Sequence, residues 1–169
     1  FSGDYRAGER TFDLLTQAAG RAGRGDVPGK VVIQTYKPDN YAITAAASQD
    51  YRAFYDIEEA YRSLMRYPPE WNMMVIMGTG MDEEQLANIM DRMYSLIRGK
   101  YINAGHLSVI GPSEPAISKI KDVYRRVLYI KHRDYRMLVD VKDYVEEWLK
   151  ENGENDVSVF FDLNPVNMY

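Results

Sequence analysis

NMMVIMG at residues 72–78, followed by TGMDEEQLANIMDRMYSLIRGK at 79–100, predicts a strand that leads into a helix. The first segment is a short apolar run, as is typical of a strand. Asp82 and Gln85 have the spacing of a capping box, which marks a helix start, and Gly99 is expected to end the helix. Between them an apolar stripe recurs at helical steps: Leu86, Ile89, Met90, Met93 and Ile97.

The segments that follow complete a recognisable order. LSVIG at 107–111 is expected to be a second strand closed by Gly111 and Pro112, and VYRRVLYIK at 123–131 a third. A helix follows with one apolar side, and DVSVFFDL at 156–163 is the last strand. That side comprises Leu138, Val141, Tyr144, Val145, Trp148 and Leu149. The order β-α-β-β-α-β predicts a ferredoxin-like domain, with an antiparallel four-stranded sheet and both helices on one face.

The residues before this domain predict a separate, more helical part. Helices are expected at 11–22, at 41–49 and after the N-cap Asp50, with Pro68 and Pro69 stopping the last. KVVIQTY at 30–36 is expected to be a buried strand. We therefore place two domains, at 1–70 and 71–169, and interpret the aromatic cluster of the first as packing, with base stacking as the alternative. The cluster comprises Tyr51, Phe54, Tyr55, Tyr61 and Tyr67.

Composition limits the kinds of site available. The 169 residues include no cysteine and two histidines, His106 and His132, so disulfides, thiolate metal sites and a histidine-rich metal site are not expected. The absence of cysteine fits a reducing compartment. No apolar run approaches the ~20 residues of a membrane span. Acid pairs such as Glu58 and Glu59 are interpreted as solvated helix faces rather than a general acid and base.

Charge is distributed unevenly along the chain. The net charge is −4, yet residues 119–136 carry seven Lys or Arg against two Asp, a local +5. Such a stretch is a candidate contact for an anionic partner, and the alternative is a charged strand edge that resists aggregation. Because side chains alternate along a strand, Arg125 and Arg126 should point to opposite faces. The candidate contact residues are Lys119, Lys121, Arg125, Arg133 and Arg136.

QAAGRAGRG at 17–25 has the composition of a phosphate-contacting segment. Gln17, Arg21 and Arg24 share one helix face, and Gly20 and Gly23 leave room beside them for a ligand or another backbone. Two guanidinium groups held this way could stabilise the charge that develops on a γ-phosphate during its transfer. The alternative is a pair of surface arginines in a glycine-rich connector.

The same residues resemble the last motif of superfamily 2 helicases. The longer stretches DYRAGERTFDLLTQAAGRAGRG, GKVVIQTYKPDN and DYRAFYDIEEAYRSLMRYPP, with the terminal DLNPVNM, resemble the C-terminal part of the bacterial primosomal protein N′ family of replication-restart helicases. The resemblance covers nearly the whole chain and is strongest over residues 4–69 and at the end. It implies that residues 1–70 are the C-terminal edge of a RecA-like lobe, and that the second domain is similar to a small-subunit ribosomal protein.

The resemblance also implies an activity. Family members are ATP-dependent 3′-to-5′ DNA helicases of the bacterial cytoplasm and nucleoid, which bind abandoned forks, single-stranded-DNA-binding protein and other primosome proteins, and no membrane. Arg21 and Arg24 would be catalytic, with Arg24 as the arginine finger, and Gln17, Gly20 and Gly23 would complete the ATP site. Asp4, Arg6, Glu9 and Arg10 also match the family, although a solvated, capped helix start explains them too.

Several family features are missing from the sequence. It has no phosphate-loop motif, no Asp-Glu magnesium motif ahead of the arginines and no cysteine-rich zinc insertion. The chain is therefore expected to be a fragment with one edge of an ATP–Mg²⁺ site and no ATPase activity of its own. The competing hypothesis is a non-catalytic ferredoxin-like module that binds nucleic acid or protein.

Overall fold

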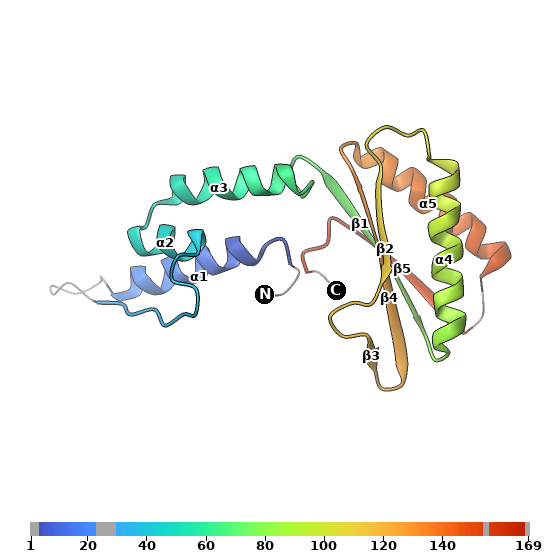
Figure 1. The fold of residues 1–169 in the computed structure, drawn as a ribbon, viewed down its shortest axis with the longest axis horizontal. Helices are drawn as coiled ribbons and strands as arrows, with labels where there is room; N and C mark the ends of the chain where they lie inside the picture. The colour runs from blue at the N-terminus through green and yellow to red at the C-terminus, as the bar shows by residue number, and fades with distance from the viewer. Residues whose placement is uncertain (1–3, 23–29, 154–155, 168–169) are drawn as a thin grey trace. The chain divides into compact units, whose positions relative to one another are not determined.

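The computed structural model describes residues 4–22, 30–153 and 156–167. The chain divides into two compact units, Phe1–Met65 and Arg66–Tyr169. The boundary between them lies a few residues before the one that the Pro68–Pro69 pair predicts. Each unit is considered separately below, and Figure 1 shows both as ribbons.

The regular structure described in the first unit consists of helices. They are α1 (Ala7–Ala22), α2 (Tyr41–Ser48) and α3 (Tyr51–Leu64). Asn40 and Asp50 cap α2 and α3 by accepting from the backbone N–H groups of Ala42 and Ala53, as expected of N-cap residues. The helices enclose a small core formed by Phe12, Ala42, Ala45, Ala46 and Phe54. Phe12 and Phe54 stack with their ring centroids 4.3 Å apart.

The strand expected at 30–36 is wrong. None of these residues is in a strand, and Val32 and Tyr36 are 81% and 106% exposed. A strand needs a neighbouring strand to pair its backbone N–H and C=O groups, and the described part of the first unit offers only helices. The aromatic cluster also packs less than expected. Phe54 is buried, but Tyr51, Tyr55 and Tyr61 are exposed.

The second unit is a mixed α/β domain with a five-stranded antiparallel sheet. The path through the sheet is β2-β4-β1-β5, with the short β3 paired to β4. The strands are β1 (Asn72–Gly80), β2 (Ser108–Ser113), β3 (Lys119–Ile120), β4 (Val123–His132) and β5 (Val157–Leu163), with α4 (Glu83–Lys100) after β1 and α5 (Tyr135–Asn152) after β4. Apart from β3, this is the predicted β-α-β-β-α-β order. Both helices lie on one side of the sheet, as expected (Figure 1).

The core of the second unit lies between the helices and the sheet. The five residues of the apolar stripe predicted on α4 are all buried. They pack with Met74 and Ile76 of β1, Leu128 and Ile130 of β4, and the apolar side of α5. Asp82 caps α4 through the backbone N–H of Gln85, which confirms the predicted helix start.

Two details of the sheet differ from expectation. Strand β2 continues beyond Gly111, whose φ of 101° absorbs a shift in register between Ile110 and Ser113. Strand β3 has no counterpart in the predicted order. It forms a hairpin with β4 through Lys121 and Asp122, both of which have positive φ, 48° and 65°. A two-residue turn of this kind normally contains Asn or Gly, so the sequence carries no hairpin signal here.

Candidate functional site

Helix α1 presents the described part of the predicted phosphate-contacting motif. Gln17, Gly20 and Arg21 are all accessible on its surface, while Phe12 faces the core. A Cβ built on Gly20 would meet none of the described residues within 4 Å, so these residues leave the space at Gly20 open. Gly23 and Arg24 lie outside the described residues. The motif residues that the structure describes are therefore accessible to a ligand.

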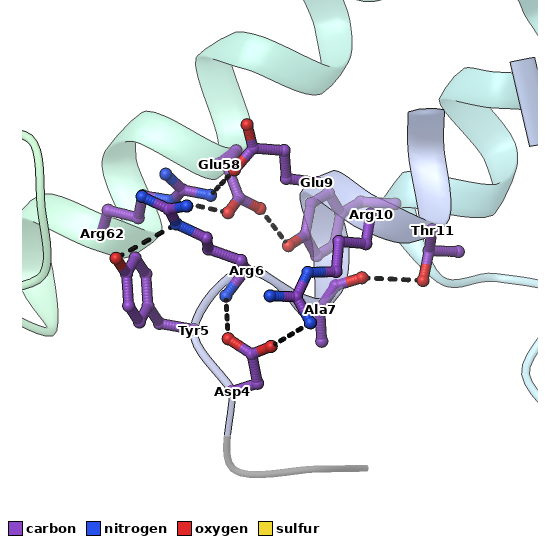
Figure 2. Close-up of polar contacts among 10 residues, drawn as sticks. Asp4, Tyr5, Arg6, Ala7, Glu9, Arg10, Thr11, Glu58 and Arg62 are labelled. Carbon is purple, nitrogen blue, oxygen red and sulfur yellow. Dashed lines mark hydrogen bonds and ion pairs between the residues drawn. The ribbon is translucent and has the colours of Figure 1, made fainter. Parts of the chain in front are cut away.

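A network of charged groups anchors the start of α1 (Figure 2). The Asp4 carboxylate accepts from the backbone N–H of Arg6 and forms an ion pair with Arg10 at 2.9 Å. In the first turn of α1, Glu9 forms an ion pair with Arg62 of α3 at 2.8 Å. The side chain of Asp4 is only 8% exposed. Asp4 thus holds the turn that leads into α1, but the interpretation of this segment as solvated is wrong for Asp4, whose carboxylate is paired with Arg10 and nearly buried.

Glu58 is the centre of the same network. It is 6% exposed, which contradicts the expectation of a solvated face. Its two carboxylate oxygens accept from Arg62 at 2.7 Å and from the Tyr41 hydroxyl. Burial, and then the hydrogen bond to Glu58, raise the pKa of Tyr41 above its ordinary value. Because both oxygens are occupied, Glu58 is suited to joining α2 and α3 rather than to proton transfer.

The network also explains a glycine. A Cβ on Gly8 of α1 would lie 2.7 Å from Glu58 Oε2 and closer still to the Tyr41 hydroxyl. Glycine at this position lets the backbone of α1 approach the Tyr41–Glu58 pair. Gly8 therefore allows α1 to pack closely against Tyr41 of α2 and Glu58 of α3.

The basic stretch does not form one patch. Lys119, Lys121 and Arg125 lie around the β3–β4 turn, whereas Arg133 and Arg136 follow the other end of β4. Eight residues separate Arg125 from Arg133, which is roughly 26 Å along an extended strand. A single small ligand cannot contact both groups, so they are two separate candidate surfaces.

Neighbouring groups hold the side chains at the turn. Arg125 donates to the carbonyl of Ile117 at 3.2 Å and to the sulfur of Met77 at 3.5 Å. Lys119 lies 3.2 Å from Asp122 and donates to the Tyr124 hydroxyl. The register pairs Thr79 with Arg125 and Gly78 with Arg126, so these two arginines do point to opposite faces, as predicted.

A cluster of cations and aromatic rings lies at the other end of β4. Trp71 is 4% exposed, and the guanidinium carbons of Arg66 and Arg133 lie 5.1 and 5.4 Å from its ring centroid. The Lys131 ammonium lies 3.6 Å from the ring centroid of Tyr67. Burial, and then the charge of Arg66, lower the pKa of Lys131 to about 8.

Sequence patterns do not reveal most of this cluster. Of its cations, only Arg133 is among the candidate residues of the basic stretch. No periodicity joins Arg66 or Trp71 to a residue some sixty positions later, because the sheet brings them together. The one available signal is the tryptophan that follows the Pro68–Pro69 pair.

The two histidines also lie near this end of β4. His106 packs edge-on against Trp71, with ring centroids 6.3 Å apart. His132 accepts the backbone N–H of Asp134 at Nδ1 and lies 3.0 Å from the carbonyl of Gly105 through Nε2. These contacts give both rings a structural role. The described residues contain no group of three side chains arranged to hold a metal, and none of their helices is long and apolar enough to cross a membrane.

Comparison with known proteins extends over the whole chain. Residues 63–166 match the family described as the primosomal protein N C-terminal domain. The chain is similar to the replication restart protein PriA of Bacillus subtilis (34% identity, 98% of this chain and 20% of the relative) and of Chlamydia trachomatis (32%, 98% and 22%). It is also similar to the replication restart protein PriA of Synechocystis (29%, 98% and 19%).

The similarity has a limited extent in the relatives. The chain spans about a fifth of their length. Among solved structures, the de novo designed protein Foldit4 matches 55% of this chain and 97% of its own length at 17% identity, with a TM-score of 0.39. That TM-score is too low to indicate a shared fold. Since the family match covers more than half of the chain and most of the second unit, the chain belongs to the primosomal protein N C-terminal domain family.

Proposed function

We propose that the chain acts in replication restart, as part of an ATP-dependent 3′-to-5′ DNA helicase that recognises stalled forks and initiates primosome assembly. The observation that carries the proposal is similarity to replication restart proteins over 98% of the chain, including the segment with the paired arginines. In this proposal the first unit is the C-terminal edge of a RecA-like lobe.

The chemistry assigned to the first unit is stabilisation of charge. Arg24 acts as the arginine finger on the γ-phosphate, and Arg21 assists it. A guanidinium offers a planar fork of donors and a permanent positive charge, which suits phosphate oxygens as negative charge develops on them. Gln17, Gly20 and Gly23 complete this edge of the nucleotide site. The accessible position of Gln17, Gly20 and Arg21 supports the assignment.

The remainder of the ATP–Mg²⁺ site must come from other sequence. This chain has no phosphate loop and no acidic magnesium motif, and two arginines alone cannot position a nucleotide. The purified 169-residue chain should therefore not hydrolyse ATP, with or without DNA. DNA-stimulated turnover by this chain would contradict the assignment of roles.

The decisive experiment is Arg24→Ala in the full-length protein. It should lower kcat for ATP by on the order of a thousandfold with little change in nucleotide affinity, because a finger acts mainly in the transition state. Arg24→Lys should not restore the rate, since an ammonium lacks the bidentate fork. Arg52→Ala is the matched control, because the Arg52 side chain is 86% exposed on α3 and pairs only weakly with Asp56. Wild-type ATPase and unwinding in Arg24→Ala would remove the catalytic role.

For the second unit, we propose binding to fork DNA or to an acidic segment of a primosome protein such as single-stranded-DNA-binding protein. Because the basic stretch forms two groups, each needs its own variant: Arg133→Gln with Arg136→Gln, and Lys119→Gln with Lys121→Gln and Arg125→Gln. For each phosphate that a variant no longer neutralises, the slope of log K against log salt concentration for DNA binding should become shallower by about 0.7 to 0.9. Unchanged binding of both partners by both variants would place the interface elsewhere.

The second candidate function is a non-catalytic module that binds nucleic acid or protein. Its support is the extensive core of the second unit, which draws on both helices and four strands. Fork binding by a full-length protein that has no ATPase activity would favour this candidate over the helicase.

A further inference from the structure

Two arginines of the second unit share one buried ring near the end of β4. The guanidinium carbons of Arg66 and Arg133 lie 5.1 and 5.4 Å from the ring centroid of Trp71, so they are at most 10.5 Å apart, the sum of the two distances. Both arginines are exposed, whereas Trp71 is 4% exposed. The fold therefore holds two permanent positive charges at the surface on a single indole, although these charges repel each other.

Nearby carboxylates do not neutralise this pair. Within the described ranges, neither guanidinium forms an ion pair or a hydrogen bond, and stacking on the indole is its contact. Asp134 follows Arg133, but its carboxylate accepts from the backbone N–H of Arg136 at the start of α5. Glu70 lies four residues after Arg66 in the sequence and forms no ion pair with it. The donors of both guanidinium groups are therefore available to an anion.

The backbone at Arg66 is a second observation. Arg66 follows Met65, the C-cap of α3, and has a left-handed φ of 57°. Where a helix ends in this conformation, the residue is usually glycine or asparagine, because a larger side chain is unfavourable there. Ending the helix does not require an arginine, so the side chain must account for the residue. It can do so by stabilising the fold on Trp71 or by binding a ligand, and the variants below separate these two roles.

The neighbouring side chains favour a nucleic acid strand over an acidic peptide as the ligand. An arginine presents a planar fork of donors that suits phosphate oxygens, and a stacked arginine holds that plane fixed. Tyr135, two residues after Arg133, is 45% exposed at the start of α5. A single strand offers both phosphates and bases that stack on aromatic rings. An acidic peptide offers carboxylates to the arginines, but no base to Tyr135.

We propose that Arg66 and Arg133, held on Trp71, bind neighbouring phosphates of a single DNA strand, with Tyr135 stacking on an adjacent base. The buried Lys131, whose pKa is lowered in part by the charge of Arg66, adds a third positive charge nearby. The inference rests on the proposed function only in taking DNA as the partner. It adds Arg66, Trp71 and Tyr135 to the binding surface and commits that surface to single strands.

The test uses the 169-residue chain with Trp148→Phe, which leaves Trp71 as its single tryptophan. A thymidine oligonucleotide should change the Trp71 fluorescence until the site is saturated, because its phosphates contact the guanidinium groups that stack on the ring. Arg66→Asn with Arg133→Gln should abolish this change. In parallel, the anisotropy of a labelled oligonucleotide gives the affinity. The slope of log K against log salt concentration should become shallower by about 0.7 for each arginine, which is about fivefold in affinity per arginine at 0.1 M salt.

The variants at Arg66 separate binding from folding. Asparagine tolerates the left-handed conformation, so Arg66→Asn should change the melting temperature little while it weakens DNA binding. Arg66→Lys keeps the charge without the planar fork, so it should preserve the salt slope and recover only part of the affinity. An arginine that only stabilises the fold would give the opposite result for Arg66→Asn, with a lower melting temperature and unchanged affinity.

The matched control is Arg98→Gln. Arg98 is exposed in the last turn of α4 and lies 6.0 Å from the ring centroid of Tyr94, so it is a stacked arginine without a second one beside it. This variant should bind the oligonucleotide as the wild type does.

The site is refuted if the Arg66/Arg133 variant keeps wild-type affinity, if Arg98→Gln loses as much, or if polyglutamate of equal charge displaces the oligonucleotide as well as unlabelled oligonucleotide does. Loss of DNA binding only in the variant of Lys119, Lys121 and Arg125 would refute this site and leave the proposed function standing. The Arg24→Ala experiment on ATPase is independent, so either proposal can fail alone.

Discussion

Replacing Gly8 with alanine should destabilise the first unit, although alanine is the better helix residue. The added Cβ would lie 2.7 Å from Glu58 Oε2 and against the Tyr41 hydroxyl, both closer than a carbon can approach. The tyrosine or the carboxylate must move, and the hydrogen bond between them is then weakened or broken. Glu58 is 6% exposed, so water cannot fully replace the missing donor.

The magnitude follows from two opposing effects. Losing a hydrogen bond to a buried carboxylate costs about 1.5–3 kcal/mol. The higher helix propensity of alanine contributes at most about 1 kcal/mol to the free energy of unfolding, and less in the first turn of a helix. The net change should be a loss of about 1–2 kcal/mol in the free energy of unfolding. For a unit of this size that lowers the melting temperature by about 4–8 °C per kcal/mol.

Gly20→Ala is the matched control on the same helix. Its Cβ would meet nothing within 4 Å, so the substitution should stabilise α1 by about 0.5–1 kcal/mol. Glycine-to-alanine substitution should therefore lower the free energy of unfolding at Gly8 and raise it at Gly20. In a Tyr41→Phe background, where the hydroxyl is already missing, Gly8→Ala should cost less than it does alone.

The assay can separate the two units. Both tryptophans, Trp71 and Trp148, belong to the second unit, so tryptophan fluorescence reports its unfolding, while circular dichroism at 222 nm reports all helices. Gly8→Ala should shift the circular dichroism transition in denaturant and leave the fluorescence transition in place. If Gly8→Ala is as stable as the wild type, or more stable, the close packing of α1 against Tyr41 and Glu58 is wrong.

Three further predictions concern the second unit. Burial lowers the pKa of Lys131 to about 8, so the folded chain binds this proton more weakly than the unfolded chain does. The free energy of unfolding should therefore rise between about pH 8 and 10.5 in denaturant titrations, and Lys131→Met should remove that rise. Asn164 accepts from the backbone N–H of Met73 at 2.9 Å and has a φ of 50°. Replacing it with alanine should lower the free energy of unfolding by about 1–3 kcal/mol, and replacing it with glycine should lower it less, as measured by tryptophan fluorescence. Gly78→Ala, whose Cβ would lie 2.6 Å from the sulfur of Met90, should cost about 1–3 kcal/mol by overpacking, and an unchanged transition midpoint would contradict this.

The order of elements in the second unit could be predicted from the sequence because its signals are local. The apolar stripe of α4, its Asp82 cap and the apolar strand segments depend on residues within a few positions of one another. These local patterns, together with the handedness of crossovers, leave few possible arrangements. Strand β3 was not predicted, because the turn after it consists of Lys121 and Asp122, a pair that is not typical of a hairpin.

The predicted strand at 30–36 shows the limit of the same reasoning. A short apolar run indicates that a segment can be a strand, but pairing requires a second strand, which is a property of the surroundings. Glu58 was misjudged for a related reason. Its position on α3 is local information, whereas its burial depends on Tyr41 and on the approach of α1 at Gly8.

Local pattern was sufficient to identify the helical motif with its exposed arginine and the excess of positive charge in residues 119–136. The division of this charge between the two ends of β4 emerged from the fold, because an extended strand separates residues that are near in sequence. The meeting of Arg66, Trp71 and Arg133 also required the fold, because antiparallel pairing joins residues that are far apart in sequence. The helices and the local charge were therefore predictable from neighbouring residues, whereas the grouping of side chains on surfaces depends on long-range pairing that no local pattern encodes.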